Sequence, residues 1–344
     1  MQDVRLVLVG VGNLGRRFCR VLRDKQEHLR ERLGLNLTLV GAADSQGAAY
    51  DPTKGLDPMR IAGLKEVGRS VAEYPGVGRA GWLATELVSS VGADVLLEAS
   101  PVNLEQDAEP AMSCIRMALG QRMHVVTPNK GPLVVGYDEL HELAATHNVK
   151  LRFDGTVAGG LPALYIGQRD LRGAVIRRLQ AVPNLCTGYV IDMLADGLSW
   201  EEAAARAREE GVLEGDGSWD LEGWDAAAKL VILANSVLAA PARLGDVDRS
   251  GITHLRPADL QEAERQGERY RLLADAELTA EGDYRFSVAP RRLSSDHPLG
   301  RLGSKQMGIV YETDIYGTIT AIIEEPDPVP SAATMLRDIL DIYR

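Results

Sequence analysis

The chain has 344 residues, of which 45% are hydrophobic and 25% charged, and it carries a formal net charge of −11. This length allows two domains, and the composition is that of an ordinary folded globular protein. The acidic balance excludes a general nucleic-acid or anionic-membrane binder, because both need a basic surface.

Cysteine usage and the first residues indicate the compartment. Cys19, Cys114 and Cys186 lie far apart and outside CxxC spacing, so we expect neither a disulfide framework nor a zinc site. The first residues lead directly into an apolar strand, without the basic segment and cleavage site of a signal peptide. No apolar run reaches the ~18 residues that a membrane-spanning helix needs. We therefore expect a cytoplasmic protein with no membrane partner.

The first motif is a glycine-rich turn between a strand and a helix. Residues 4–10 form an apolar run, and residues 16–33 have the pattern of an amphipathic helix. This context predicts a Rossmann dinucleotide-binding domain, with the pyrophosphate at the helix N-terminus. A glycine turn without a ligand is the alternative. The residues that we expect at the pyrophosphate are Gly10, Gly12, Asn13, Leu14 and Gly15.

A second strand, residues 37–43, ends at Asp44, where the ribose-binding acid of such domains usually lies. Ser45 follows, with no adjacent Arg or Lys to bind a 2′-phosphate, which favours NAD over NADP. Three basic residues a little further along are able to fold back and reverse this preference: Arg60, Lys65 and Arg69. The alternative is that Asp44 only caps a turn and does not bind a ribose.

Two further strands, residues 93–100 and 124–128, lead into polar residues. Ligands bind outside the carboxyl ends of the strands in a doubly wound sheet. We therefore expect Asn129 and Lys130 near the nicotinamide, and Ser100 and Thr127 at the cofactor. A solvated loop lysine is the alternative for Lys130.

From about residue 149 the pattern changes to strands and helices that do not alternate regularly. Strands are predicted at 177–183, 284–289 and 307–312, and helices after the capping box Ser199–Glu202, at 224–238 and at the C-terminus. We predict an α/β protein with a Rossmann domain (1–148) and an α+β substrate-binding and dimerisation domain (149–317). The last segment (318–344) is expected to pack back on the Rossmann domain.

The segment 214–229 places five carboxylates ahead of one lysine: Glu214, Asp216, Asp220, Glu222, Asp225 and then Lys229. Asp225 and Lys229 are four residues apart, so they share one face of a helix. Such a pair is able to bind an amino acid and transfer a proton. A plain surface salt bridge is the alternative.

These motifs together resemble the homoserine dehydrogenase family. The resemblance rests on the segment 214–229, Val125-Val-Thr-Pro-Asn-Lys-Gly131, Phe153-Asp-Gly-Thr-Val-Ala-Gly-Gly-Leu-Pro162 and Asp296-His-Pro-Leu299. It covers nearly the whole chain and corresponds to the family's catalytic core, so we expect no match to the C-terminal regulatory extension that some members carry. The family's spacing of a Glu, an Asp eleven residues later and a Lys four beyond is kept by Glu214, Asp225 and Lys229.

The resemblance implies an NAD(P)-dependent oxidoreductase that reversibly reduces aspartate-4-semialdehyde to homoserine, on the route to threonine and methionine. It implies that Asp225 and Lys229 handle the reacting oxygen and that Lys130 lies between substrate and nicotinamide. Glu214 and Asp220 then hold the substrate's α-ammonium group. The family is usually a homodimer through the second domain.

The resemblance also implies a structural monovalent cation, Na⁺ or K⁺. The matching ligands are the Asp154 side chain and the carbonyl groups of Val157, Gly159 and Leu161. The family has a Glu where this chain has Asp154, which is one methylene shorter.

Two segments depart from the family pattern. Leu185 and Cys186 replace a glycine and a hydroxyl in the substrate-binding Gly-Thr, so either Thr187 takes over this contact beside Cys186 or the substrate differs. The acidic, proline-containing segment 323–328 replaces a glycine-rich loop near the cofactor, which disfavours a 2′-phosphate there. Two alternatives therefore stay open: a dehydrogenase of another small amino aldehyde or amino alcohol, and a catalytically silent nucleotide-sensing protein.

Overall fold

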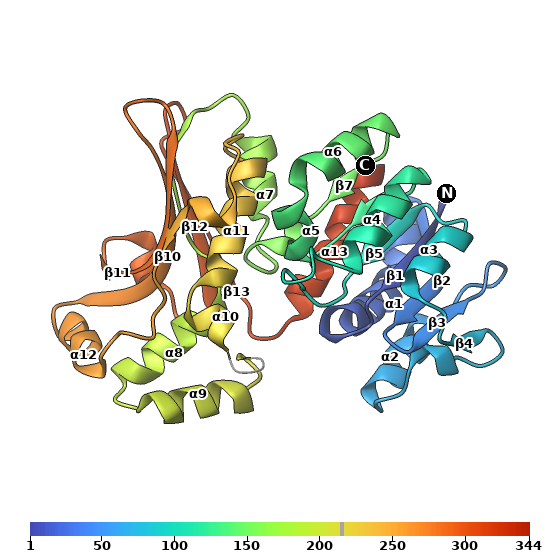
Figure 1. The fold of residues 1–344 in the computed structure, drawn as a ribbon, viewed down its shortest axis with the longest axis horizontal. Coiled ribbons are helices and arrows are strands. Elements are labelled where there is room, and N and C mark those ends of the chain that lie inside the picture. Colours follow the sequence, from blue (N-terminus) through green and yellow to red (C-terminus); the bar gives the residue numbers. More distant parts are fainter. Residues whose placement is uncertain (214–216) are drawn as a thin grey trace. The chain divides into compact units, whose positions relative to one another are not determined.

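The structure is a computed structural model that describes residues 1–213 and 217–344. The chain divides into two compact units, Met1–Gly160 with Asp327–Arg344, and Leu161–Pro326 (Figure 1). Both boundaries differ from the expected ones after residues 148 and 317. Strand β7 (Leu151–Arg152) joins the sheet of the first unit, and β13 (Thr318–Glu324) joins that of the second.

The first unit contains, among the described residues, a seven-stranded sheet in the order β4-β3-β2-β1-β5-β6-β7. β1, β2, β5, β6 and β7 are parallel, and β3 and β4 form an antiparallel edge. The remaining strands of this sheet are β1 (Gln2–Val9), β2 (Leu35–Asp44), β3 (Gly47–Tyr50), β4 (Gly78–Ala80), β5 (Val95–Glu98) and β6 (His124–Val126). In this order β2 lies on one side of β1, and β5, β6 and β7 follow on the other side. A reversal of strand order next to β1 is typical of the predicted Rossmann domain.

The helices of the first unit are α1 (Asn13–Leu33), α2 (Pro58–Glu66), α3 (Ala84–Ser90), α4 (Ala111–Gly120), α5 (Lys130–Val135), α6 (Tyr137–Thr146) and α13 (Val329–Tyr343). The C-terminal helix α13 packs on α1 (Figure 1). Its Met335 and Ile339 lie in the same apolar cluster as Phe18 and Leu22. Burial of one such side chain stabilises a fold by about 1.5–3 kcal/mol. The C-terminal helix therefore belongs to the first unit, whereas residues 318–326, which were expected to pack there with it, belong to the second.

The second unit contains, in its described part, a six-stranded sheet in the order β13-β12-β8-β10-β11-β9. Neighbouring strands are antiparallel except for β11 and β9. These strands are β8 (Ile176–Val182), β9 (Val247–Arg249), β10 (Glu268–Leu278), β11 (Tyr284–Ser294) and β12 (Gln306–Thr313). The three strands predicted from the sequence are confirmed, although β11 continues to Ser294.

The helices of the second unit are α7 (Ala163–Tyr165), α8 (Leu185–Ala195), α9 (Trp200–Glu209), α10 (Ser218–Leu221), α11 (Trp224–Ser236) and α12 (Pro257–Arg265). α8, α11 and α12 contact the long strand β10. The capping box of Ser199 and Glu202 opens α9 as predicted. An ion pair between buried Arg271 of β10 and Asp192 of α8, at 2.8 Å, fastens the helix to the sheet.

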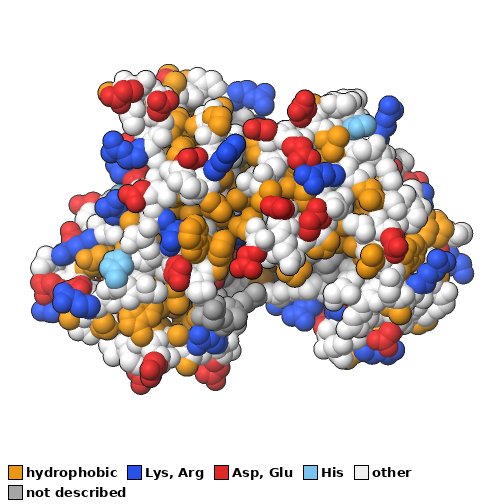
Figure 2. Space-filling view, viewed as in Figure 1, with side chains coloured by type: hydrophobic (Ala, Val, Ile, Leu, Met, Phe, Trp, Pro, Cys, Tyr) orange, Lys and Arg blue, Asp and Glu red, His pale blue; other side chains and the backbone are white. Residues whose placement is uncertain are grey.

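On the face shown in Figure 2, acidic and basic side chains are interspersed among apolar ones. Among the described residues, no helix combines the length and the apolar character that crossing a membrane requires.

Candidate functional site

The glycine turn after β1 has the geometry of a phosphate cradle. A Cβ atom on Gly15 would lie 2.2 Å from the Gly10 carbonyl oxygen, so only glycine lets α1 start this close to β1. By contrast, a Cβ on Gly12 would meet nothing within 4 Å in the described structure. α1 begins at Asn13 and Leu14 without a side-chain cap, so its first N–H groups are available to an anion. These features fit a dinucleotide pyrophosphate.

Asp44 lies at the end of β2 as predicted, and the protein itself holds its carboxylate. Lys65 Nζ binds Oδ2 at 2.7 Å, and the Ser70 hydroxyl donates to Oδ1 at 2.8 Å. The backbone amides of Val71 and Gln46 donate one further hydrogen bond each. Burial by itself raises the pKa of Asp44, but these four hydrogen bonds together lower it below its ordinary value. The carboxylate is therefore charged and fixed in place at the edge of the sheet.

Glu98, the last residue of β5, accepts hydrogen bonds from two of the predicted polar residues, Ser100 and Thr127. Its side chain is buried, and one oxygen accepts hydrogen bonds from the amide, at 2.9 Å, and the hydroxyl of Ser100. The other oxygen accepts from Thr127 Oγ1 at 3.3 Å. Asn129 Nδ2 donates to the Ser100 carbonyl at 3.1 Å, which ties β5 to the segment after β6. Burial raises the pKa of Glu98 to about 7, against the hydrogen bonds that lower it.

Lys130 is the first residue of α5, and Asn129 is the cap of this helix, since its side chain accepts from the Gly131 amide at 3.0 Å. Both residues lie in the segment between the carboxyl end of β6 and the first turn of α5. Lys130 is half-buried. It therefore stays a candidate for contact with a bound nicotinamide.

A polar cluster in the second unit joins α11 to the end of β8. Lys229 Nζ lies 2.7 Å from Asp225 Oδ2, and the two side chains are only 13% and 9% exposed. Lys229 also donates to the Pro183 carbonyl at 2.9 Å and to Asn184 Oδ1 at 3.1 Å. Asn184 Nδ2 in turn donates to Asp225 at 2.6 Å. This is a built, largely buried cluster and not a surface salt bridge.

The start of α11 explains how the sequence builds this cluster. Gly223, the residue before the helix, has a φ of 84°, a conformation that glycine adopts without strain. The turn sets Asp225 in the first turn of α11, where the helix dipole stabilises a carboxylate. Lys229 follows one turn later on the same face.

Two of the predicted substrate residues, Asp220 and Cys186, lie beside this cluster. Asp220 Oδ1 is 3.4 Å from Asn184 Nδ2. Burial, with Asp220 and Asp225 nearby, raises the pKa of the Cys186 thiol far above its ordinary value, so Cys186 stays neutral. Thr187 is also buried, and its hydroxyl has no hydrogen-bond partner in the part of the chain that the structure describes. A buried hydroxyl of this kind is available to a bound polar ligand.

Glu214 and Asp216 lie outside the described residues, so the expected role of Glu214 stays a prediction. Glu222 accepts from the Trp224 indole N–H at 3.2 Å and is exposed. It is therefore separate in role from Asp220 and Asp225.

The residues expected to bind a monovalent cation do not fit one as they stand. Arg337 of α13 donates to Asp154 Oδ2 and, at 2.9 Å, to the Gly160 carbonyl. The carboxylate that the cation needs is therefore already bound by a guanidinium group. Val157 and Gly159 belong to the same turn as Asp154, whereas Leu161 is the first residue of the second unit.

The acidic segment after β13 has local structural contacts. The Asp327 side chain accepts from the Val329 amide at 2.7 Å, at the start of α13, and Glu325 is buried. The Glu325 amide donates to the Lys305 carbonyl at 2.9 Å. Asp327 and Glu325 therefore hold the chain between β13 and α13.

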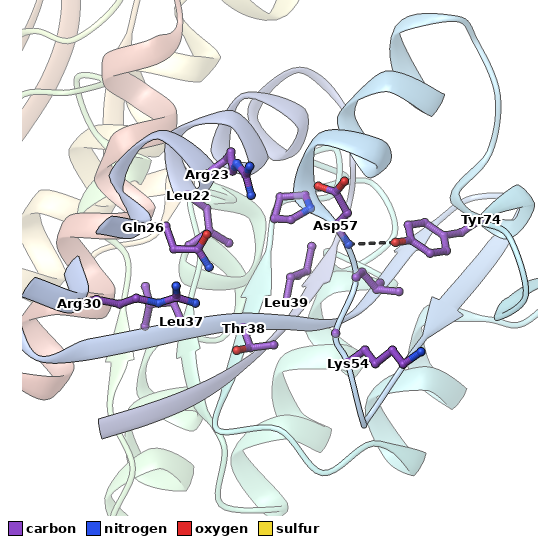
Figure 3. Close-up of a pocket in the computed structure, with 13 residues that line it drawn as sticks. Leu22, Arg23, Gln26, Arg30, Leu37, Thr38, Leu39, Lys54, Asp57 and Tyr74 are labelled. Carbon is purple, nitrogen blue, oxygen red and sulfur yellow. Dashed lines mark hydrogen bonds between the residues drawn. The ribbon is translucent and has the colours of Figure 1, made fainter. Parts of the chain in front are cut away.

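A pocket of about 320 Å³ in the first unit is lined by residues other than those predicted to bind the cofactor (Figure 3). It is lined by the second half of α1, including Arg23 and Arg30, by Thr38 of β2 and by the segment around Asp57. The glycine turn lies at the opposite, N-terminal end of α1. This pocket is therefore not the expected dinucleotide site.

The predicted residues thus fall into one set in each unit, and sequence reasoning missed a member of each. Glu98 had a signal, since an acid ends an apolar strand two residues before Ser100. Asn184 had one too, because it lies two residues past the carboxyl end of β8. Glu98 connects Ser100 to Thr127, and Asn184 connects the Asp225–Lys229 pair to Asp220.

Comparisons with known proteins agree with this arrangement. Residues 162–340 match the family model for homoserine dehydrogenase, and residues 10–154 match that for its NAD-binding domain. An NAD(+)-dependent homoserine dehydrogenase from Pseudomonas canavaninivorans is 32% identical over 100% of this chain and 97% of its own. A homoserine dehydrogenase from Methanocaldococcus jannaschii is 33% identical over 98% of both chains.

Solved structures give the same result. A putative homoserine dehydrogenase from Archaeoglobus fulgidus has a TM-score of 0.85 and 30% identity, covering 99% of both chains. A hyperthermophilic archaeal homoserine dehydrogenase in complex with NADPH has a TM-score of 0.84 and 27% identity, covering 99% of this chain and 98% of its own. The chain therefore belongs to the homoserine dehydrogenase family, whose members are NAD(P)-dependent oxidoreductases acting on a CH–OH group.

Proposed function

We propose that this protein interconverts L-homoserine and L-aspartate-4-semialdehyde with NAD as the preferred cofactor. The observation that carries the proposal is the Asn184–Asp225–Lys229 cluster, in which a largely buried ammonium lies 2.7 Å from a carboxylate. Family membership supplies the class of reaction, and this cluster supplies groups able to perform it.

The chemistry requires a positive group at the reacting oxygen. Reduction of an aldehyde builds negative charge on its oxygen, and a fixed ammonium stabilises that charge and donates the proton. We assign this role to Lys229, which Asp225 and the Pro183 carbonyl hold in position. The nicotinamide, when bound, supplies the hydride to the aldehyde carbon. We assign Lys130 to the contact between substrate and nicotinamide.

The substrate's amino group needs carboxylates. Asp220 lies beside the cluster and is assigned to the α-ammonium group together with Glu214. The Thr187 hydroxyl, beside Cys186, is suited to a polar substrate atom. This arrangement supports an amino-acid substrate of small size.

The preference for NAD is supported by how the first unit uses its basic residues. Lys65 pairs with Asp44, Arg69 with Glu73 at 2.7 Å, and the Arg60 guanidinium stacks over the Tyr74 ring. The three cations that the sequence offers for a 2′-phosphate each have a partner. The charged Asp44 repels a 2′-phosphate and accepts hydrogen bonds from a 2′-hydroxyl.

We further propose a cytoplasmic homodimer. The three cysteines are buried and unpaired, as in proteins of a reducing compartment. Ile315 and Tyr316, in the turn between β12 and β13, are 62% and 52% exposed, and Val175 beside them is 49% exposed. The Asp314 amide donates to the Val175 carbonyl at 3.0 Å, so Val175 lies next to this turn, and we refer to these three exposed apolar residues as the apolar patch. A subunit contact at this patch would cover them.

One assay tests the function against its alternatives: reduction of NAD⁺ and of NADP⁺ with L-homoserine beside a panel of related amino alcohols. We expect the highest kcat/KM with L-homoserine and NAD⁺, and Asp44→Ala to lower it for NAD⁺ more than for NADP⁺. A higher kcat/KM for another amino alcohol would transfer the assignment to that substrate. No reduction with any of them would favour a nucleotide-sensing protein.

A further inference from the structure

The turn from Asp154 to Gly160 contains a buried carboxylate that needs a positive partner. The Asp154 side chain is 1% exposed. A charged carboxylate in such a place is stable only when cations or hydrogen-bond donors surround it. A metal ion or a basic side chain is able to satisfy it.

In this chain the partner is a side chain of the C-terminal helix. Arg337 uses two nitrogens of one guanidinium group: Nη2 donates to Asp154 Oδ2 and Nη1 donates to the Gly160 carbonyl at 2.9 Å. The group therefore joins the carboxylate at one end of the turn to a carbonyl oxygen at the other. A coordinated Na⁺ or K⁺ would draw together the same kinds of oxygen.

The packing of α13 fixes Arg337 in this place. A Cβ on Gly155 would lie 2.3 Å from Thr334 Oγ1, so the turn is in close contact with the helix one turn before Arg337. The Asp154 amide also donates to Asp338 Oδ2 at 3.2 Å, and both Thr334 and Asp338 are buried. Because Asp154 is one methylene shorter than a glutamate, it leaves more space for the planar guanidinium.

We propose that Arg337 is a built-in cation that takes the place of a monovalent metal ion in this turn. A metal ion stabilises a fold only in proportion to its concentration relative to its dissociation constant. A guanidinium that belongs to the chain has no such dependence. The wild-type protein is therefore indifferent to Na⁺ and K⁺, and removal of Arg337 creates a site that these ions fill.

The test is the melting temperature of the full chain in NaCl, KCl and choline chloride at matched ionic strength. For the wild type we expect the same melting temperature in all three salts. For Arg337→Ala we expect a lower value in choline chloride, and a rise of about 2–4 °C in NaCl or KCl, the shift that about 1 kcal/mol produces in a domain of 150–250 residues. The measurement needs neither substrate nor cofactor, so it is independent of the proposed function.

The matched control is Arg152→Gln, because Arg152 also links the first sheet to α13, through Asp341 at 2.5 Å. This variant should have the same melting temperature in all three salts. Stabilisation of the wild type by Na⁺ or K⁺ beyond choline overturns the proposal. So does an Arg337→Ala variant whose melting temperature is the same in all three. If Arg337→Ala folds in none of the salts, Arg337→Gln replaces it with the same expected rise.

Discussion

At the scale of single residues, the polar cluster of the second unit depends on an amide that both donates and accepts. Asn184 is 4% exposed, donates to Asp225 and accepts from Lys229. An aspartate in its place would not donate, and an alanine would do neither. Asn184 thus sets the distance and orientation of the Asp225–Lys229 pair without needing to contact the substrate.

We predict that Asn184→Ala lowers kcat about tenfold, which corresponds to about 1.4 kcal/mol in the barrier. Lys229 keeps its contacts with Asp225 and the Pro183 carbonyl in this variant, so the loss should be partial. Steady-state kinetics with L-homoserine measure it. Asn235→Ala is the control, since Asn235 lies on α11 with Asp225 and Lys229 but exchanges its hydrogen bonds with the Ala242 backbone. Equal losses in both variants would contradict a positioning role for Asn184.

Glu98 gives a prediction for stability. Its pKa is raised by burial from an ordinary value of 4.5 to about 7 in the folded protein. Below pH 4.5 both the folded and the unfolded chain carry the proton. As the pH rises from 4.5 to about 7 the unfolded chain loses it first, so stability falls, by about 3 kcal/mol at most. Above pH 7 this contribution changes no further.

We expect Glu98→Gln to remove this fall. The difference in the free energy of unfolding between the variant and the wild type should shift in favour of the variant as the pH rises from 4.5 to about 7. Urea denaturation at a series of pH values measures the difference. Parallel curves for the two proteins would show that Glu98 does not titrate in this range.

At the scale of elements, the glycine turn assigns different tasks to Gly12 and Gly15. Gly15 allows α1 and β1 to approach, whereas Gly12 faces open space at the start of α1. Gly15 serves packing, and we propose that Gly12 leaves room for the pyrophosphate, although both belong to one motif.

Two alanine substitutions should separate these tasks. Gly15→Ala forces a carbon against the Gly10 carbonyl and should lower the melting temperature by several degrees. Gly12→Ala should leave the melting temperature nearly unchanged but weaken NAD binding at least tenfold, because its methyl group occupies the space of the pyrophosphate. Thermal melts and titration of NADH fluorescence measure the two effects. A Gly12→Ala variant that binds NADH normally would contradict this placement of the cofactor.

At the scale of the whole molecule, we predict a homodimer that uses the apolar patch of Val175, Ile315 and Tyr316. Sedimentation equilibrium should give twice the chain mass of 37.3 kDa. Tyr316→Lys should shift the protein towards the monomer, because an exposed charge opposes burial of the patch. Leu83→Lys, an exposed apolar residue of the first unit, is the control. A wild type that sediments as a monomer would contradict the prediction.

How much the sequence reveals depends on how local each feature is. The strand–glycine–helix motif, the capping box of α9 and the amphipathic α13 are local patterns, and the structure confirms them. The domain boundaries in the structure differ from the predicted ones, because β7 and β13 are assigned to a sheet only by their pairing with β6 and β12. The residues of a single strand do not specify which other strand it pairs with.

The candidate site shows the same limit. Asp225 and Lys229 share a helix, so their spacing was sufficient to pair them. Arg337 and Asp154 are 183 residues apart, and no local pattern connects them. The burial that raises the pKa of Glu98 likewise arises only when β5 is enclosed in the sheet.

The most direct test of the proposed mechanism is the turnover of Lys229→Ala with L-homoserine and NAD⁺, beside the wild type and Lys305→Ala, which removes an exposed lysine of the same unit. The wild type and Lys305→Ala should reduce NAD⁺ at similar rates. Lys229→Ala should lose about 10²–10⁴-fold in kcat, the usual contribution of a general acid, with little change in NADH affinity. Unchanged turnover in Lys229→Ala would contradict the assignment of Lys229 as the group that handles the proton.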